Sequence, residues 1–347
     1  MDGPGPKYEV IRYHPGLLAG VLEFVRPYWG SDDALNQAYL SWKYEANPYV
    51  ALPHLYLVSY QGKLVGIRGF MASAWEAEGL DRSKVLFCAG DLAVDPAHRG
   101  KGLVPAMLES FRADQSSAPP QVLSLSANAA ARISMLRAGW RYVAPLLRFW
   151  RPGRGRLKSL LQRLDWRKSA EALPPDISIS DSPEVDAMVD LVDRIGHDGR
   201  IRMVRDRAYM KWRFLNPRLH YGFCYLRSNR VRAYLVFRTR PNRPDGVKIL
   251  DWEGETAEER RKLLLATLRI MDGPVEMHRS ALEATDRSAL ADAGFVERAP
   301  DSRSNRHAAL FVISGRPDGS PGAWKLGRRN LLDIDEWDYR GLYADGG

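Results

Sequence analysis

Hydrophobic and polar positions along the chain predict a regular succession of strands and helices in its first half. Apolar runs rich in β-branched and aromatic residues predict strands, and apolar residues at helical spacing predict helices. The strands expected are residues 8–13, 55–59, 64–70, 85–94, 121–126 and 140–150. The helices expected are residues 17–25, a helix that opens after Gly102, and residues 128–138. Gln61-Gly62 predicts a hairpin turn, and Gly139 predicts the end of the last helix.

The second half repeats this succession. The segment AYLSWKYEANP at residues 38–48 returns as AYMKWRFLNP at residues 208–217. The strands expected after it are residues 223–226, 231–237, 247–252, 275–278 and 310–313, with helices at 258–270 and before 291–295. A repeat of this kind predicts two similar structural units. The aromatic residues of the repeated segment have helical spacing, so we expect them in the core rather than on a ligand.

One stretch, residues 90–108, carries a specific chemical signal. An expected strand ends at Asp95-Pro96, and the loop Arg99-Gly100-Lys101-Gly102 follows. The two glycines allow backbone N–H groups to turn toward one point, with two cations beside them. Because apolar residues at helical spacing come next, the loop also opens onto the positive end of a helix dipole. Together these features predict an anion site suited to a diphosphate.

The spacing of the glycines separates the classes of nucleotide-binding loop. A Walker loop requires GxxxxGK[ST] and a dinucleotide fingerprint requires GxGxxG, and neither stands here. Residues 94–102 instead resemble V-x-P-x-x-R-G-x-G, the pyrophosphate loop of the GNAT acyltransferase superfamily. The element order extends the resemblance over nearly the whole chain. It implies an α/β fold of two tandem GNAT-like domains, each a mixed sheet flanked by helices, as in tandem GNAT proteins of bacterial polysaccharide or natural-product pathways.

The resemblance also implies the residues of an acyl-CoA site. Backbone groups of Leu92, Ala93 and Val94 would pair with the pantetheine arm. The residues expected around the pyrophosphate are Arg99, Gly100, Lys101, Gly102, Leu103 and Val104. The last of these is bulkier than the Gly or Ala that the family often has there. Asn128 matches a family position that contacts the CoA arm. Acetyl-CoA, or another acyl-CoA, is therefore the expected co-substrate.

Catalytic groups are expected beside the thioester. Asp91 is the candidate general base or ligand of the amine, although an acid there can also serve as a structural hydrogen-bond partner. The family position that often carries a tyrosine as acid for the thiolate holds Met135, a residue expected to contact the cofactor, and a thioether cannot give a proton. Tyr142, Ser134 or water would then protonate the thiolate. The CoA thiolate can also leave without receiving a proton, since a thiol has a pKa of about 8.5.

The second repeat lacks the basic loop. Its counterpart is Glu255-Thr256-Ala257-Glu258, and acids at a helix N-terminus cap the helix but would repel a diphosphate. We therefore expect one acyl-CoA site, in the first repeat. The domains expected are an N-terminal GNAT domain at 1–150, a basic linker helix at 151–172, and a degenerate GNAT-like domain at 173–347 whose tail docks on the fold.

Composition narrows the class of protein. A chain of 347 residues can build two cores, and its two cysteines, Cys88 and Cys224, lie in apolar runs, which argues against a disulfide scaffold. No signal pattern or long apolar segment is present, so we expect a cytoplasmic protein without a membrane span. The histidines lack metal-ligand spacing, so no metal is expected. We expect a monomer or a homodimer.

Part of the net charge of +9 is concentrated near the middle of the chain. The basic residues there are Arg148, Arg151, Arg154, Arg156, Lys158, Arg163, Arg167 and Lys168. Such a cluster could meet phosphates, an acidic lipid surface or RNA, although basic solvated linkers are common.

Three functions remain open from the sequence. The first, which we favour, is an acyl-CoA-dependent N-acyltransferase that acts by direct transfer to a primary amine of a small molecule or amino-sugar. The second is a tandem GNAT resembling the aminoacyl-tRNA-dependent transferases, which predicts strongly salt-dependent tRNA binding. The third is a non-catalytic acyl-CoA-binding protein, which predicts binding without turnover.

Overall fold

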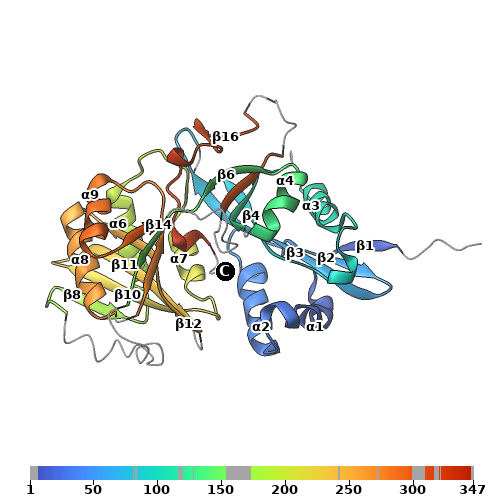
Figure 1. The fold of residues 1–347 in the computed structure, drawn as a ribbon, viewed down its shortest axis with the longest axis horizontal. Helices are drawn as coiled ribbons and strands as arrows, with labels where there is room; N and C mark the ends of the chain where they lie inside the picture. Colours follow the sequence, from blue (N-terminus) through green and yellow to red (C-terminus); the bar gives the residue numbers. More distant parts are fainter. Residues whose placement is uncertain are drawn as a thin grey trace, which may run out of the picture.

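The computed structural model describes residues 7–80, 82, 84–115, 120–127, 129–153, 173–240, 243–271, 273–298, 309–315, 320 and 322–344. The elements form two lobes that lie side by side, and the C-terminal tail runs between them (Figure 1). Asn128 and the expected linker helix, apart from residues 151–153, lie outside the described residues.

The first lobe is built on a mixed sheet with the strand order β1-β2-β3-β4-β5-β15-β6. Its strands are β1 (Tyr8–Arg12), β2 (Leu55–Tyr60), β3 (Lys63–Glu76), β4 (Val85–Val94), β5 (Val122–Ala127), β6 (Arg141–Pro145) and β15 (Ala309–Ile313). Its helices are α1 (Leu18–Trp29), α2 (Asp33–Leu40), the π-helix η2 (Ser41–Glu45), α3 (Leu103–Ala113) and α4 (Ala129–Arg137), with short 3-10 turns η1 (Pro15–Leu17) and η3 (Pro96–His98). Phe111 of α3 stacks on Phe70 of β3, so α3 covers one face of the sheet.

The second lobe repeats this plan around a sheet with the strand order β14-β7-β13-β12-β11-β10-β8. Its strands are β7 (Arg148–Arg151), β8 (Ile177–Ser180), β10 (His220–Arg227), β11 (Val231–Arg240), β12 (Arg243–Gly254), β13 (Val275–His278) and β14 (Val296–Arg298). Its helices are α6 (Val185–Ile195), α7 (Arg207–Arg213), α8 (Ala257–Arg269) and α9 (Ala284–Asp292). The short elements are β9 (Arg202–Met203), β16 (Lys325–Leu326), β17 (Arg329–Asn330), η6 (Ile334–Glu336) and η7 (Gly341–Tyr343).

The last strands of the two halves exchange places, which corrects two strand predictions. Residues 140–150 do not form one closing strand: β6 stays in the first sheet, whereas β7 pairs with β13 and β14 in the second. The strand expected at 310–313 to complete the second unit is β15, which inserts between β5 and β6 of the first. Only Leu146 and Leu147 separate β6 from β7, so the chain passes from one sheet to the other almost at once.

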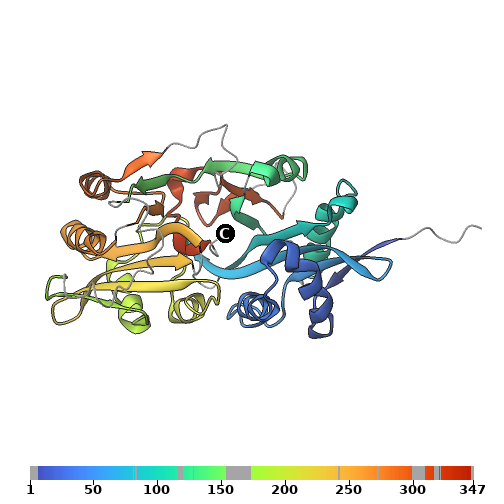
Figure 2. The same ribbon diagram turned by 60° about the horizontal axis from the view of Figure 1, so that its bottom comes forward.

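Each sheet therefore includes a strand from the other half of the chain. Figure 2 shows β15 beside the green strands of the first half and β7 running toward the orange strands of the second. Other expectations are confirmed, among them the hairpin turn at Gln61-Gly62, where both residues have positive φ, and the close of α4 at Gly139.

The repeated segments pack against each other where the lobes meet. Trp42 of η2 and Trp212 of α7 stack with ring centres 5.0 Å apart and planes 10° from parallel. Each indole N–H donates to the other residue's carbonyl oxygen, both at 2.7 Å. The pair thus has approximate two-fold symmetry, and it lies in one buried apolar cluster that contains residues of both halves. The prediction that these aromatic residues belong to the core is confirmed for the two tryptophans.

Candidate active site

Strands β4 and β5 run parallel but separate soon after they begin. Their pairing is limited to Phe87 with Val122 and Cys88 with Leu123. Beyond Cys88, β4 continues for another six residues, to Val94, and keeps its pairing with β3 on the other side. No other described strand pairs with β4 along this length. The stretch of β4 without a described strand partner on the β5 side, called the opening below, therefore begins at Ala89 and includes Leu92, Ala93 and Val94.

A bulge in β4 places Asp91 at this opening. The pairing shifts between Ile67–Ala93 and Gly69–Gly90, so Asp91 and Leu92 together face the single residue Arg68. Asp91 has a φ of +47°, in the left-handed region that few side chains other than Asn and Asp adopt. The strained backbone turns the Asp91 carboxylate out of the regular strand alternation.

Three side chains of the repeated segment hold the Asp91 carboxylate. Lys43 Nζ forms an ion pair with Oδ2 at 2.6 Å, and the Tyr44 hydroxyl donates to the same oxygen at 2.5 Å. The Tyr39 hydroxyl lies 3.5 Å from Oδ1 and accepts a hydrogen bond from Lys43 at 3.1 Å. The Lys43 side chain is 2% exposed and that of Asp91 11% exposed, so this is a nearly desolvated ion pair. Burial, followed by the neighbouring Asp91 charge, raises the pKa of Tyr44 well above its usual range.

The π-helix and a glycine make these contacts possible. Trp42, Lys43 and Tyr44 are consecutive, and the wider turn of η2 carries all three into buried positions. The Tyr44 ring crosses β3 at Gly69, where a Cβ would stand 1.7 Å from the Tyr44 hydroxyl oxygen. The sequence interpretation missed Lys43 and Tyr44 because it treated the whole segment as core. The signal available was a lysine between two aromatic residues.

The loop after β4 has the open, N–H-rich geometry expected of an anion site. Gly100 and Gly102 have φ values of +74° and +73°, and a Cβ at either glycine would meet nothing within 4 Å. Gly102 is the N-cap of α3 and no side chain caps the helix, so the first N–H groups of α3 have no partner within it. Arg99 and Lys101 are exposed, and Arg99 Nε donates to the Val94 carbonyl at 3.1 Å.

The remaining predicted residues lie on either side of this region. Leu103 is buried beneath the loop, Val104 is partly buried, and Met135 is 4% exposed within the apolar cluster under α3. Tyr142, on β6, is 44% exposed, and its ring meets Phe311 edge-on at 5.4 Å; burial of its inner side raises its pKa.

The corresponding loop of the second repeat is closed to anions. Thr256 and Glu259 form a reciprocal capping box, so side chains already satisfy N–H groups at the start of α8. Glu255 makes ion pairs at 2.9–3.2 Å with Arg194, Arg230 and Arg232. Arginines thus neutralise Glu255 and Glu259, and Glu259 with Thr256 caps the helix.

The C-terminal tail fills the opening of the second sheet. Strands β12 and β13 pair from Val247–Val275 to Ile249–Met277 and then separate, as β4 and β5 do. Beyond that point Arg340 bridges to Arg279, and the Ser280 amide donates to the Tyr339 carbonyl at 3.0 Å. The tail is therefore inserted where the first sheet remains open. The prediction that it docks on the fold is confirmed.

Arg213, the counterpart of Lys43, holds this tail. Its guanidinium donates to the carbonyl oxygens of Leu342 and Ala344 at 2.9 and 2.7 Å and to the Tyr221 hydroxyl at 2.6 Å. One repeat position thus serves two purposes: Lys43 pairs with Asp91 at an open sheet, and Arg213 fastens the segment that closes the other.

A buried cluster of charges surrounds the inserted tail. Its carboxylates are Asp251, Glu253 and Asp338, and its guanidinium groups are Arg205, Arg279 and Arg340. Arg340 donates to Asp251 at 2.7 Å, chelates Asp338, and pairs with Glu253. Burial alone would raise the pKa of Asp338, but Arg340 and Arg279 lower it to about 2. The cluster is therefore ionised at neutral pH.

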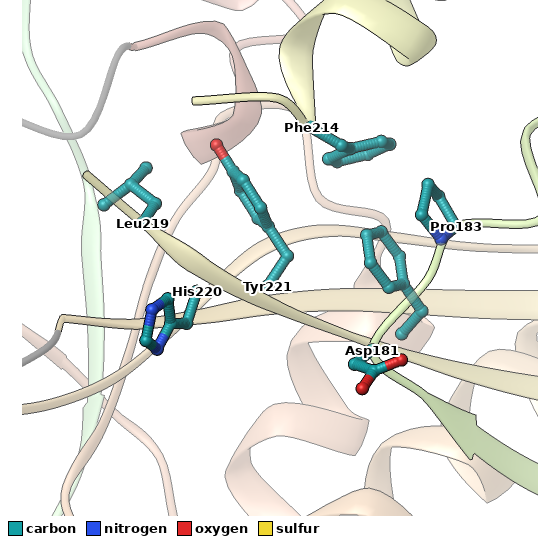
Figure 3. A pocket seen from close by; sticks show the side chains of 7 residues that line it. Asp181, Pro183, Phe214, Leu219, His220 and Tyr221 are labelled. Atoms are coloured by element: carbon teal, nitrogen blue, oxygen red, sulfur yellow. The ribbon is translucent and has the colours of Figure 1, made fainter. Parts of the chain in front are cut away.

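Two hollows lie away from the loop. One, of about 350 Å³, is lined by Asp181, Pro183, Phe214, Leu219, His220, Tyr221 and Phe223 of the second repeat (Figure 3). The other, of about 200 Å³, is lined by residues of both lobes, including Glu76, which pairs with Arg82 and Arg202. None of the predicted site residues lines either hollow.

Further predictions concern cysteines, metals and membranes. Cys88 and Cys224 are buried, and neither forms a disulfide bond. Across the described ranges, no three His, Cys, Asp or Glu residues are grouped as metal ligands would be. Within the same ranges no helix has the length and apolarity needed to cross a bilayer. Arg148 pairs with Glu276 at 2.6 Å and Arg151 is 5% exposed, so these two members of the basic cluster contribute to the second sheet.

The two sheets, the bulged and splayed central strands, and the loop at a helix N-terminus define a tandem GNAT fold. Solved structures agree with this. The chain is similar to a GCN5-related N-acetyltransferase from Anabaena variabilis ATCC 29413, with a TM-score of 0.58 and 13% identity over 88% of this chain and 72% of that one. It is also similar to a tandem GNAT protein from the clavulanic acid biosynthesis pathway, with a TM-score of 0.57 and 12% identity over 90% of this chain and 100% of that one.

A third similar structure is a putative acetyltransferase from Pyrococcus horikoshii, with a TM-score of 0.53 and 9% identity over 95% of this chain and 92% of that one. No protein-family model matches the chain. No curated protein sequence matches it either. At identities this low, the similarity establishes the fold.

Proposed function

We propose that the protein is an acyl-CoA-dependent N-acyltransferase with a single donor site in the first repeat. The observation that carries the proposal is the difference between the two openings. The first has a free edge of β4 and a glycine loop at the uncapped N-terminus of α3. The second has a capped helix and an inserted tail. Acyl-CoA needs the first arrangement, because its diphosphate requires N–H donors and cations and its amide arm requires backbone partners.

The residues present fit the expected donor, acetyl-CoA or another acyl-CoA. Gly100 and Gly102 leave room for phosphate oxygens next to the backbone, and Arg99 and Lys101 add charge. From Leu92 to Val94, β4 has no described strand partner on the β5 side, so its backbone offers hydrogen-bonding groups to the pantetheine arm. Bound acyl-CoA supplies an activated thioester, which a primary amine of a small molecule or amino-sugar attacks directly. The chain's own residues align the two reactants and exclude water.

We assign Asp91 a positioning role. Both carboxylate oxygens have partners in Lys43, Tyr44 or Tyr39, so the carboxylate ties the bulge to η2 and fixes the backbone next to the thioester. Tyr142, named from the sequence as a donor, is on β6, which β15 separates from β5 and the opening, so we propose that the departing thiolate takes up through water the proton that the amine releases. Asp91→Asn tests the first role: it should destabilise the fold while the acidic limb of the kcat/KM profile is kept. Loss of that limb would identify Asp91 as the general base instead.

The first test is isothermal titration with acetyl-CoA, CoA and bulk tRNA. Acetyl-CoA should bind to the wild-type protein with micromolar affinity, and an Arg99→Glu/Gly102→Glu variant with an unchanged circular dichroism spectrum should not bind it. A matched control, Arg194→Glu on α6, which alters the ion pair with Glu255 of the second repeat's loop, should bind normally. Salt-sensitive tRNA binding without CoA binding would refute the proposal in favour of an aminoacyl-tRNA-dependent transferase. Acetyl-CoA binding with no turnover in an amine screen would favour a non-catalytic binding protein.

A further inference from the structure

A buried arginine of β3, the strand that pairs with β4, has no carboxylate partner within the described part of the chain. Arg68, on β3, is 5% exposed. Among the described residues its guanidinium makes no ion pair or hydrogen bond, and its Nε is buried and unpartnered. Its contacts are with aromatic rings: the guanidinium carbon lies 5.7 Å from the ring centres of both Phe70 and Trp140. Burial lowers the pKa of Arg68 to about 10, so it remains a cation at neutral pH.

The face and register of Arg68 on β3 relate its guanidinium to the proposed acyl-CoA site. Arg68 and Phe70 are on the same face of β3, and Phe70 stacks on Phe111 of α3, so the guanidinium lies on the face covered by α3. Phe70 pairs with Ala89, the first residue of β4 beyond its pairing with β5. Arg68 itself stands opposite the bulge at Asp91 and Leu92, two to three residues beyond Ala89.

The carboxylate closest to Arg68 in the pairing of β3 with β4 is that of Asp91, and it lies on the opposite face of the sheet. Asp91 faces η2, where it pairs with Lys43 and Tyr44, and the Tyr44 ring crosses β3 at Gly69, on the face opposite Arg68. Asp91 therefore does not neutralise Arg68. A buried guanidinium without a counter-ion is costly, and a hydrophobic residue of similar volume would pack between two aromatic rings without that cost. The cost is recovered if a ligand brings the missing anion.

We propose that Arg68 binds a carboxylate at the far end of the acyl group, so that the preferred donor is a dicarboxylic acyl-CoA such as succinyl-CoA. This inference rests on the proposed function. The diphosphate belongs to the loop at the N-terminus of α3, beyond the end of β4, whereas Arg68 stands opposite the bulge at Asp91 and Leu92, farther from that loop, where the acyl group would point. A planar guanidinium is the side chain best suited to a carboxylate, because its N–H groups match two oxygens.

The test compares the affinities of CoA, acetyl-CoA and succinyl-CoA by titration calorimetry. Wild-type protein should bind succinyl-CoA about tenfold or more tightly than acetyl-CoA, as a charge-assisted hydrogen bond predicts. Arg68→Gln and Arg68→Met should bring the two affinities together and leave that of CoA unchanged. The matched control is Arg238→Gln, because Arg238 is buried and stands the same distance after Trp212 as Arg68 stands after Trp42. It should keep the wild-type preference.

Thermal melting gives a second readout. Without ligand, Arg68→Met should melt higher than wild type, because an unpaired buried charge is removed, and only wild type should gain more from succinyl-CoA than from acetyl-CoA. Equal affinities for the two acyl-CoAs in wild type, or a preference that survives in Arg68→Met, would overturn the inference and leave the proposed function intact. Equal weakening of CoA and both acyl-CoAs would also overturn it, since Arg68 would then contact CoA itself. Absence of binding by all three would refute the proposed function and this inference with it.

Discussion

Arg340 is the residue whose loss should damage the inserted tail most. Its side chain is 4% exposed and pairs with Asp251, Glu253 and Asp338. With Arg205 and Arg279 the cluster contains equal numbers of guanidinium groups and carboxylates. Arg340→Met keeps the volume but leaves one buried negative charge in excess.

Removing one partner of a buried ion pair costs about 3–5 kcal/mol, because the remaining charge stays desolvated. We expect Arg340→Met to lower the free energy of unfolding by this amount at pH 7, measured by urea denaturation with tryptophan fluorescence. The matched control is Arg261→Met. It breaks the half-exposed Arg261–Asp292 pair, with both side chains at least 50% exposed, and should change stability by less than about 0.5 kcal/mol.

The change of folding stability with pH provides a second test of this charged cluster. The pKa of Asp338 is about 2 in the folded protein against an ordinary value of 3.8, so its pairing stabilises the fold above about pH 4 and is lost as the pH falls through 2. In Arg340→Met, protonation of a carboxylate removes the excess charge, so the difference from wild type should shrink between pH 7 and pH 3. A loss below about 1 kcal/mol at pH 7, or a loss that grows in acid, would refute the assignment of this cluster as a neutral, fully ionised set.

Three further changes test other parts of the structure. Trp212→Ala removes the stacked partner of Trp42 and should cost about 3–5 kcal/mol in urea unfolding; a loss under 1 kcal/mol would show that the paired indoles do not hold the lobes together. Gly69→Ala places a Cβ 1.7 Å from the Tyr44 hydroxyl oxygen and should lower the melting temperature by several degrees, whereas an unchanged melting curve would contradict the crossing of Tyr44 over β3. Burial raises the pKa of Cys224 to about 12, so iodoacetamide should modify it only after denaturation, and rapid labelling of the native protein, read by mass spectrometry, would contradict its burial.

The sequence was sufficient to predict the fold because local signals agreed with each other along most of the chain. Apolar runs marked the strands, the Gln61-Gly62 pair marked a hairpin, and the spacing of residues 94–102 resembled one known loop. The exchange of β7 and β15 could not be predicted in this way. Strand pairing depends on which edges are free in three dimensions, and residues 140–150 are one apolar run to any local pattern.

The candidate site was predictable only in part for a similar reason. Asp91 and the glycine loop carry their own signals, since acid on a strand and glycine beside cations are unusual. Lys43 and Tyr44 sit within an aromatic helical segment, and their role depends on a π-turn and on the missing side chain of Gly69, one strand away. The cation of Arg68 looks ordinary in sequence, because nothing local tells whether a carboxylate will face it.

The exchange of strands also constrains how the protein can be made. The first sheet lacks β15 until residue 313 has left the ribosome, by which time almost the whole second half has been synthesised. A nascent first half must therefore wait with β5 and β6 unjoined, and their exposed edges are open to pairing with other chains. The two halves are thus expected to mature in one late step, and a gene cut after residue 153, beyond the end of β7, should yield fragments that form soluble protein only when both are produced together.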